Sequence, residues 1–294
     1  MITVHKLKKS YGDRVAVNGI DFDIQRGETY GFLGPNGAGK TTTISMLVGL
    51  IAPDSGSIRV AGGDPFQLKT RIKLGVAPQS LSLYDNLSGT DNLRFFGSLY
   101  QLSGNHLRHR TDWALKLAGL TDRAKDKVAT YSGGMKRRLN IAVALLHDPE
   151  VLLLDEPTVG VDPQSRNHIL ETIGELSRQG LTIIYTTHYM EEAERLCHRI
   201  AIMDYGTILA NETKDQLLAK YGGDATVKAL IAANPLGLEL PGQITNGHVE
   251  FRSARPVDEL SALHQQGVEF SEVHIAKPNL ENVFLNLTGR TLRD

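Results

Sequence analysis

One short segment constrains this chain of 294 residues more than any other: Gly34-Pro35-Asn36-Gly37-Ala38-Gly39-Lys40-Thr41, followed by Thr42. Two glycines separated by four residues precede a lysine and a hydroxyl residue, which is the spacing of a phosphate-binding loop. The apolar pattern predicts a strand at Thr29–Leu33 before this segment and a buried helix at Lys40–Leu50 after it. A glycine-rich turn that merely caps a helix is the alternative. The flanking strand and helix favour the phosphate-binding loop.

The residue types of the loop suit a nucleoside triphosphate. Glycines let backbone N–H groups converge on phosphate oxygens, and the N-terminus of the following helix favours negative charge. In such a loop Lys40 bridges the β- and γ-phosphates, and the Thr41 hydroxyl binds Mg²⁺. We therefore expect a triphosphate and Mg²⁺, held by the residues from Gly34 to Thr42.

A second element, an apolar strand that ends in two acidic residues, supplies the carboxylates that the loop lacks. Val151–Leu154 is an apolar run that ends in two carboxylates, Asp155 and Glu156. A buried parallel strand delivers such residues at its carboxyl end, where open α/β sheets bind ligands. Asp155 is expected to hold Mg²⁺ and Glu156 to orient or deprotonate the attacking water. Alone, the pair is more typical of a helix cap or an exposed surface, but beside a phosphate-binding loop it predicts hydrolysis.

The periodicity along the chain predicts an α/β fold. Alternating apolar and polar residues with turn signals over Thr3–Leu33 indicate antiparallel strands. A helical period then runs from about Ser88 to Leu146 and predicts a helical insertion. Strand character returns at Val151–Leu154, Leu181–Tyr185 and Arg199–Met203, each preceded by an expected helix. This alternation is typical of a sheet with parallel strands, so a mixed sheet is expected overall.

A short glycine-containing stretch, Tyr221–Asp224, predicts a linker between residues 1–222 and residues 223–294. The second part has shorter, mixed elements and is interpreted as a small α+β appendage. Its expected strands are Ala225–Ile231, Val249–Arg252 and Val273–Ala276, and its expected helices are Pro256–Gln266 and Leu280–Thr288. The apolar face of the last helix favours packing onto the appendage, with self-association as the alternative.

Charge and composition exclude several classes of partner. Thirty-two basic and thirty-three acidic residues give a formal net charge of -1, so no basic field draws in nucleic acid. The only cysteine, Cys197, closes no disulfide within the chain. The apolar runs, such as Ile141–Leu146, are far shorter than the ~20 residues of a membrane span, and no signal peptide is readable. These features predict a cytoplasmic chain that does not itself cross a membrane.

A third segment makes the combination specific. Ser132-Gly133-Gly134 precedes a helix expected to run to Leu146. With the loop and the carboxylate-ended strand, the chain resembles the ATP-binding subunit of an ABC transporter. The signature of that family is usually Leu-Ser-Gly-Gly-Gln, whereas Tyr131 and Met135 stand at its ends here. This departure resembles the branch that exports drugs, lipids and polysaccharides. The segment also fits an ordinary helix N-cap.

The resemblance implies roles for further residues. Gln79 matches the glutamine that touches Mg²⁺ and senses the membrane partner, and His188 matches the histidine that contacts the γ-phosphate. Asp162 matches an aspartate at the interface of two ATP-binding domains, and Tyr11 matches the aromatic ring that stacks on adenine. Singly, these residues also fit a solvated amide, a strand-end histidine, a turn aspartate and a strand-end aromatic. Their order from Tyr11 to His188 follows that of the family.

The family also implies partners. One loop and one signature per chain imply a second copy of this chain, arranged head to tail so that each ATP lies between the loop of one copy and the signature of the other. A separate transmembrane permease would then be driven from the cytoplasmic face of the membrane. The resemblance thus implies a peripheral ATPase subunit of an exporter, without nucleic acid. The alternative is a soluble ABC ATPase that acts on a ribosome or a nucleic-acid complex.

Two surface features complete the sequence-based expectations. Apolar and aromatic residues near Gln79 suggest a cleft that holds a short helix of the permease, formed by Leu81, Leu83, Tyr84, Phe95 and Phe96. Some of them are expected to fill the core of the helical insertion instead. The basic run Lys136-Arg137-Arg138 is interpreted as a solvated or carboxylate-paired face.

Overall fold

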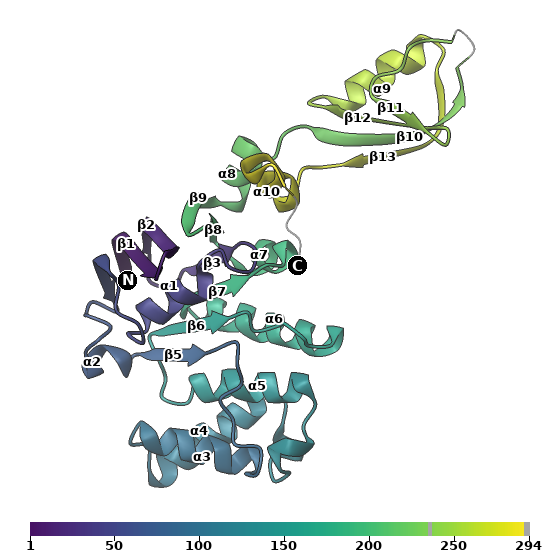
Figure 1. Ribbon diagram of the computed structural model, residues 1–294. Coiled ribbons are helices and arrows are strands. Elements are labelled where there is room, and N and C mark those ends of the chain that lie inside the picture. Colours follow the sequence, from purple (N-terminus) through teal and green to yellow (C-terminus); the bar gives the residue numbers. More distant parts are fainter. Residues whose placement is uncertain (235–236, 291–294) are drawn as a thin grey trace. The chain divides into compact units, whose positions relative to one another are not determined.

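The computed structural model describes residues 1–234 and 237–290, and its chain divides into two compact units (Figure 1). The first unit spans Met1–Thr213, and the second begins at Lys214. The sequence predicts this division nine residues later, after residue 222, and residues 291–294 of the predicted second domain lie outside the described residues. The difference is helix α8 (Lys214–Tyr221), which packs against a helix of the second unit.

The centre of the first unit is a six-stranded sheet with the order β5-β6-β7-β3-β8-β9. Neighbouring strands are parallel from β5 to β8, and β9 is antiparallel to β8. Its strands are β3 (Thr29–Leu33), β5 (Leu74–Ala77), β6 (Val151–Asp155), β7 (Thr182–Thr187), β8 (Arg199–Asp204) and β9 (Thr207–Thr213). The predicted mixed sheet of an α/β fold is confirmed.

Strand β6 shows why this sheet is buried on both faces. Val151 and Leu153 belong to the core on one side, and Leu152 and Leu154 to the core on the other. A continuous apolar run satisfies both sides, as is usual for parallel strands covered by helices. The polar end of the run, at Asp155 and Glu156, therefore has a defined place at the carboxyl edge of the sheet.

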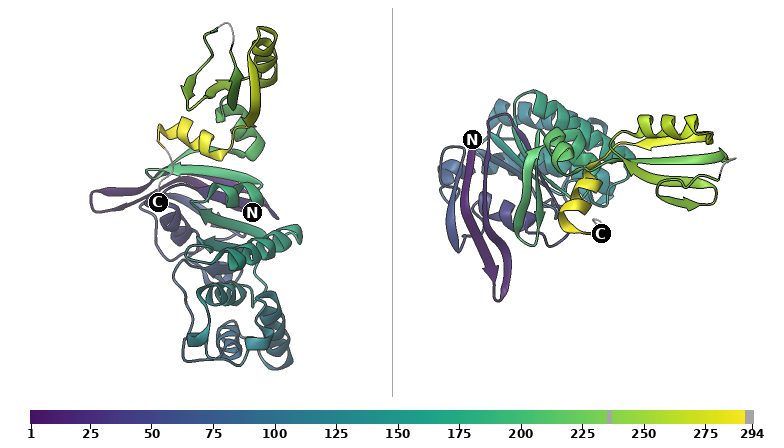
Figure 2. Two further views of the ribbon diagram at one scale, coloured as in Figure 1. Left: turned by 90° about the vertical axis from the view of Figure 1, so that its right-hand side faces the viewer. Right: turned by 90° about the horizontal axis from the view of Figure 1, so that it is seen from above.

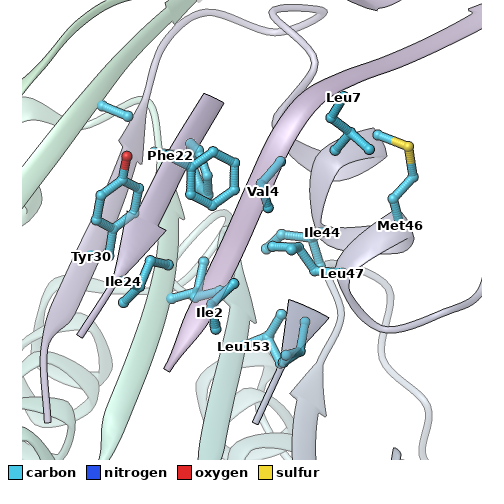
Figure 3. Close-up of a cluster of buried hydrophobic side chains, with 14 of the residues drawn as sticks. Ile2, Val4, Leu7, Phe22, Ile24, Tyr30, Ile44, Met46, Leu47 and Leu153 are labelled. Atoms are coloured by element: carbon cyan, nitrogen blue, oxygen red, sulfur yellow. The ribbon is translucent and has the colours of Figure 1, made fainter. Parts of the chain in front are cut away.

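One face is covered by helix α1 (Lys40–Leu47) and by a three-stranded antiparallel sheet. The strands of that sheet are β1 (Ile2–Tyr11), β2 (Arg14–Ile24) and β4 (Ser55–Val60), in the order β2-β1-β4. Figure 3 shows Ile44 and Leu47 of α1 lying between Ile2 and Val4 of β1 and Leu153 of β6. The helix that follows the glycine-rich loop is thus held from both sides. The short helix α2 (Leu68–Arg71) precedes β5.

The other face packs against α5 (Gly133–Ala144), α6 (Pro163–Arg178) and α7 (Met190–Leu196). Helix α5 also closes the core of the predicted helical insertion with α3 (Gly89–Leu99) and α4 (Gly104–Leu117). The short 3₁₀ turns η1 (Thr121–Arg123) and η2 (Val128–Thr130) connect α4 to α5. The insertion lies beyond the β5 edge of the sheet in both Figure 1 and Figure 2. Within the described residues, no helix combines the length and the apolar character needed to cross a bilayer.

The second unit is a four-stranded antiparallel sheet with the order β11-β12-β10-β13. Helix α9 packs on the face formed by residues such as Val227, Val249 and Phe251. Its elements are α8, β10 (Ala225–Ala233), β11 (Gln243–Thr245), β12 (His248–Ser253), α9 (Pro256–Gln265), β13 (Glu269–Ala276) and α10 (Leu280–Thr288).

Helix α10 joins α8 within the second unit, as the apolar face predicted from Leu280 to Leu287 requires. Leu280, Val283 and Phe284 are buried, and the Asn286 Nδ2 donates to the Tyr221 carbonyl at 2.8 Å. An Asn279 capping box begins α10, and Gly289 ends it in a left-handed conformation. Because α8 and α10 contact each other, the boundary between the units lies before α8.

Because β6 is buried on both faces, we expect that shortening one of its core side chains lowers the free energy of unfolding. Leu153→Ala removes a fully buried side chain and should lower the free energy of unfolding of the first unit by about 2–5 kcal/mol. Urea denaturation followed by the fluorescence of Trp113, the only tryptophan, measures this loss. Leu50→Ala, at a side chain that is 73% exposed, is the control and should change it by less than about 0.5 kcal/mol. Equal midpoints for the two variants would contradict the assigned core.

Candidate functional site

The glycine-rich loop between β3 and α1 has a backbone that only glycine accommodates at several positions. Gly37 and Gly39 have φ values of 83° and 106°. A Cβ at Gly34 would lie 2.2 Å from the Met203 carbonyl oxygen, and one at Gly39 would lie 2.5 Å from that of Ala16. The loop thus approaches neighbouring backbone too closely for any side chain, and it leads directly into the N-terminus of α1. This is a cradle of the kind that binds phosphate groups.

Lys40 is held inside this cradle, with 4% of its surface exposed. Its Nζ donates to the carbonyl oxygens of Gly34 at 2.7 Å and Pro35 at 3.1 Å, and it lies 3.2 Å from the Glu156 Oε1. Burial lowers the pKa of Lys40, and the Glu156 and Asp155 carboxylates act in the opposite direction. The ammonium group is therefore placed between the loop and the end of β6, where it can meet an anionic ligand.

The end of β6 is anchored by Thr186 of β7. The Thr186 Oγ1 donates to the Asp155 Oδ1 at 2.6 Å and accepts from the Glu156 backbone N–H at 3.0 Å. Glu156 itself has a left-handed φ of 46°, a strained conformation for a residue with a side chain. Strain of this kind persists only where the surroundings hold it.

The Glu156 carboxylate is the meeting point of three loops. Its Oε2 accepts from the Gln79 Nε2 at 3.2 Å, and its Oε1 lies 3.4 Å from the His188 Nδ1. Lys40 contacts the same Oε1. The residues predicted from separate parts of the sequence, Gln79, Glu156 and His188, therefore converge on one point beside the phosphate-binding loop.

A cavity of about 470 Å³ lies over this point, within the range of small-molecule sites. It is lined by Tyr11, Arg14, Ala16, Gln79, Glu156 and the residues from Asn36 to Thr42. The structure thus brings Tyr11, 49% exposed, to the same cavity as the loop. Arg14 was missed by the sequence analysis. The Arg14 Nη2 lies 3.1 Å from the position that a Cβ on Gly37 would occupy. The only local sequence feature that could have indicated this role is its position just after the turn that follows Tyr11.

The predicted oxygen donors for a metal are divided between cavity and core. Thr41 and Gln79 line the cavity, whereas Asp155 is 4% exposed and hydrogen-bonded to Thr186. Hydroxyl, amide and carboxylate oxygens are the ligands that Mg²⁺ prefers. The chemistry of this donor set fits the expected ion.

The signature residues do not join this cavity within one chain. Ser132 and Asp162 line a second cavity of about 580 Å³, together with Met135, Arg138, Gln164, Ser165 and His168. Ser132 caps α5 by accepting from the Met135 N–H at 3.2 Å, so the alternative of a helix N-cap is realised. Asp162 caps α6 by accepting from the Ser165 N–H at 2.9 Å, and this hydrogen bond lowers the pKa of Asp162.

Gly134 fits closely between these two helix starts. A Cβ at this position would lie 2.2 Å from the Ser165 Oγ and 3.0 Å from the Asp162 Oδ2. A Cβ at Gly133 would meet nothing closer than the Gly160 carbonyl at 3.9 Å. Only Gly134 is therefore required by packing, and Gly133 leaves the backbone at the start of α5 open to a ligand.

The basic run on α5 differs from the expectation. Lys136 pairs with Asp85 at 2.8 Å, as a carboxylate-paired face would. The interpretation is wrong for Arg137, which is 7% exposed and donates to the carbonyl oxygens of Pro78 at 3.1 Å and Gln79 at 2.8 Å. Helix α5 therefore holds the backbone of the Gln79 loop. No local pattern could reveal this, because the acceptors lie 58 and 59 residues earlier.

The aromatic residues expected near Gln79 form an exposed cluster. Tyr84 and Phe95 are 48% and 39% exposed, and their rings cross edge to face with centroids 4.9 Å apart. Phe96 packs on both rings and on the helical core, which Leu83 also joins, while Leu81 is exposed. The set therefore divides between a surface and a core, as the sequence suggested.

Comparisons with known sequences agree with this geometry. The model of a family described as ABC transporter matches residues 17–159. The linearmycin resistance ATP-binding protein LnrL of Bacillus subtilis is 46% identical, over 100% of this chain and 100% of that protein. The daunorubicin resistance ATP-binding protein DrrA3 of Streptomyces coeruleorubidus is 39% identical, over 98% and 96%. The Nod factor export ATP-binding protein I of Paraburkholderia xenovorans is 40% identical, over 100% and 98%.

Solved structures show the same fold. An ATP-binding subunit of an ABC transporter aligns with a TM-score of 0.69 at 30% identity, covering 76% of this chain and 93% of that one. The ATP-binding cassette MJ0796, in a dimeric post-hydrolysis state bound to ADP and phosphate, aligns with a TM-score of 0.67 at 27% identity. That alignment covers 72% of this chain and 98% of the other.

The fit around Gly134 yields a matched pair of substitutions. Gly134→Ala forces Ser165 and Asp162 away from α5 and should lower the free energy of unfolding by about 1–3 kcal/mol. Gly133→Ala adds its methyl group in open space at a helix start and should leave that free energy unchanged or slightly raised. Urea midpoints followed by Trp113 fluorescence compare the two variants. Identical midpoints would show that the contact between α5 and α6 is assigned wrongly.

Proposed function

This chain belongs to the ABC transporter family of ATP-binding proteins, and from that premise we propose that it is the ATP-hydrolysing subunit of an exporter. The observation that carries the proposal is the convergence of Lys40, Gln79 and His188 on the Glu156 carboxylate beside the glycine-rich loop. Relatives named for resistance and export support this function over action on a ribosome or a nucleic-acid complex.

In this proposal the triphosphate lies along the loop. Backbone N–H groups of the loop after Pro35 and the N-terminus of α1 face its phosphates. Lys40 exchanges its carbonyl partners, Gly34 and Pro35, for phosphate oxygens, which gives this buried cation anionic partners in addition to Glu156. Tyr11 and Arg14 line the same cavity, where Tyr11 offers a ring face to the adenine base.

Thr41, Gln79 and Asp155 are the residues that would hold Mg²⁺. A bound ion supplies charge neutralisation for the phosphates. The Thr186 hydroxyl, which donates to Asp155, orients that carboxylate.

Glu156 is the proposed general base for the attacking water. Lys40 and Gln79 restrain its two oxygens, and the backbone bond to Thr186 holds its strained conformation. The His188 side chain reaches the same carboxylate from the end of β7 and is the proposed contact for the γ-phosphate. Water activation and charge stabilisation thus come from residues on three different loops.

A second copy of the chain completes the site in this proposal. Ser132 and Asp162 lie at another cavity from that of Lys40, so one chain offers two half-sites. A head-to-tail pair places the start of α5 of each copy against the triphosphate of the other. The dimeric state of the related cassette MJ0796 supports this arrangement.

The exporter also needs a transmembrane permease, which places this subunit peripherally at the cytoplasmic face of the membrane. The proposed contact is the aromatic cluster of Leu81, Tyr84, Phe95 and Phe96, because it presents exposed rings next to the Gln79 loop. Aromatic surfaces of this kind hold a short amphipathic helix. Arg137, which binds the backbone of the same loop, would carry a displacement there toward α5.

The role of Glu156 predicts a separation of binding from turnover. Glu156→Gln keeps the shape of the side chain but removes the base, so kcat for ATP hydrolysis should fall by about 10²- to 10⁴-fold while the Kd for ATP stays the same. The variant should elute as a dimer in size-exclusion chromatography with Mg²⁺ and ATP. Glu175→Gln, at an exposed position on α6, is the control. Wild-type turnover of Glu156→Gln would refute the assignment of the base.

The permease contact predicts a position-specific crosslink. A photoreactive phenylalanine analogue at position 95, in full-length protein co-expressed with its permease, should yield an adduct of the combined mass in isolated membranes. The same analogue at Leu68, which is 69% exposed on α2, is the control and should yield none. Absence of the adduct at position 95, or equal yields at both positions, would remove the aromatic cluster as the docking site.

A further inference from the structure

Glu192 on α7 is a fully buried carboxylate to which neither the sequence analysis nor the proposed function gives a role. Its Oε1 accepts from the Thr158 Oγ1 and the Arg166 Nε, both at 2.7 Å. Its Oε2 accepts from the Tyr185 hydroxyl at 2.7 Å and the Thr187 Oγ1 at 2.8 Å. Four donors use the full acceptor capacity of an ionised carboxylate.

Three of the four donors, Thr158, Tyr185 and Thr187, lie within three residues of Glu156 or His188. Thr158 lies two residues after Glu156, and Thr187 directly precedes His188. Arg166 is on α6, the helix that Asp162 caps, and its guanidinium also lies 4.6 Å from the centre of the Tyr189 ring. The Thr187 hydroxyl in turn accepts from the Tyr189 N–H at 2.9 Å. Glu192 therefore connects the segment after Glu156 to the segment before His188 through hydrogen bonds.

This network is costly to break. A buried carboxylate without partners, or a buried hydroxyl without an acceptor, has given up its hydrogen bonds to water with no replacement, so the folded state is destabilised by the full desolvation free energy. With all four bonds made, the loop after β6 and the end of β7 are fixed relative to each other through one side chain. Glu192 does not line the cavity of Lys40, so it has no direct contact with a ligand there.

We propose that Glu192 is a positioning residue for ATP hydrolysis, which holds the Glu156 and His188 side chains at their 3.4 Å separation by joining Thr158 to Thr187. The proposal rests on the roles given above to Glu156 and His188. It assigns Glu192 to the geometry of the chemical step and not to the binding of ATP.

The test compares kcat with the Kd for ATP in the purified full-length chain. Glu192→Ala removes the shared acceptor and should lower kcat by about 10- to 100-fold, as loss of a supporting hydrogen-bond partner typically does. The Kd for ATP should remain at the wild-type value, because Lys40 and the loop are outside the network. The amide of Glu192→Gln keeps two acceptor positions and can donate to the hydroxyls. Its kcat should therefore lie between that of Glu192→Ala and that of the wild type.

Glu191→Gln is the matched control. Glu191 is the neighbouring residue, its side chain is 92% exposed, and it lies 3.9 Å from the Arg166 Nη2. This variant should have wild-type kcat. Thr158→Val is the second test should Glu192→Ala fail to fold, because it removes one donor of the network and should also lower kcat at an unchanged Kd. Thermal unfolding identifies the variants that remain folded at the assay temperature.

A double-mutant comparison separates this inference from the proposed function. If Glu192 acts through His188, the kcat of the double variant His188→Ala/Glu192→Ala should equal that of His188→Ala alone. Wild-type kcat in Glu192→Gln and Thr158→Val, or a loss of ATP affinity instead of kcat, would overturn the inference. Wild-type kcat in both His188→Ala and Glu156→Gln would overturn the proposed function itself, and the inference with it.

Discussion

The structure of the site depends on the burial of one cation. Lys40 has almost no contact with solvent, and its ammonium group lies between two loop carbonyls and the Glu156 carboxylate. A buried charge is tolerated only when it is paired and hydrogen-bonded, so the loop, the end of β6 and the start of α1 must remain together. The glycines allow the close approach of the backbone that this requires. The resulting cluster already has the charge pattern that a phosphate group completes.

Two side chains outside the cavity extend this constraint into the rest of the first unit. Arg137 binds the backbone of the Gln79 loop from α5, and Glu192 binds the loop after β6 and the end of β7 from α7. Each is a buried ionic side chain that makes several hydrogen bonds, Arg137 to one loop and Glu192 to several segments. The Gln79 loop and the end of β7 are thus held by helices on one face of the sheet, and this rigid support is what a precise hydrolytic site needs.

The sequence reveals those parts of the site whose signal is local. The loop, the apolar run that ends at Asp155 and Glu156, and the strands β3, β6, β7 and β8 are visible because spacing and periodicity lie within a few residues. Arg137 and Glu192 are not visible, since their partners lie up to 59 residues away or on another element. The unit boundary differs for the same reason. Gly222 and Gly223 suggest a linker, but α8 belongs with α10, about 60 residues later.

Helix α5 gives the two cavities of the first unit a physical connection. Its N-cap Ser132 and Met135 of its first turn line the second cavity, and Arg137 holds the Gln79 loop of the first. A helix moves as a rigid body over such a short distance, so a shift of its N-terminus displaces the Gln79 carbonyl as well. Gln79 donates to Glu156, and a ligand that contacts the start of α5 can therefore alter the geometry around the proposed base. This route lies within one chain, and in the proposed dimer it would make each copy responsive to the nucleotide held by the other.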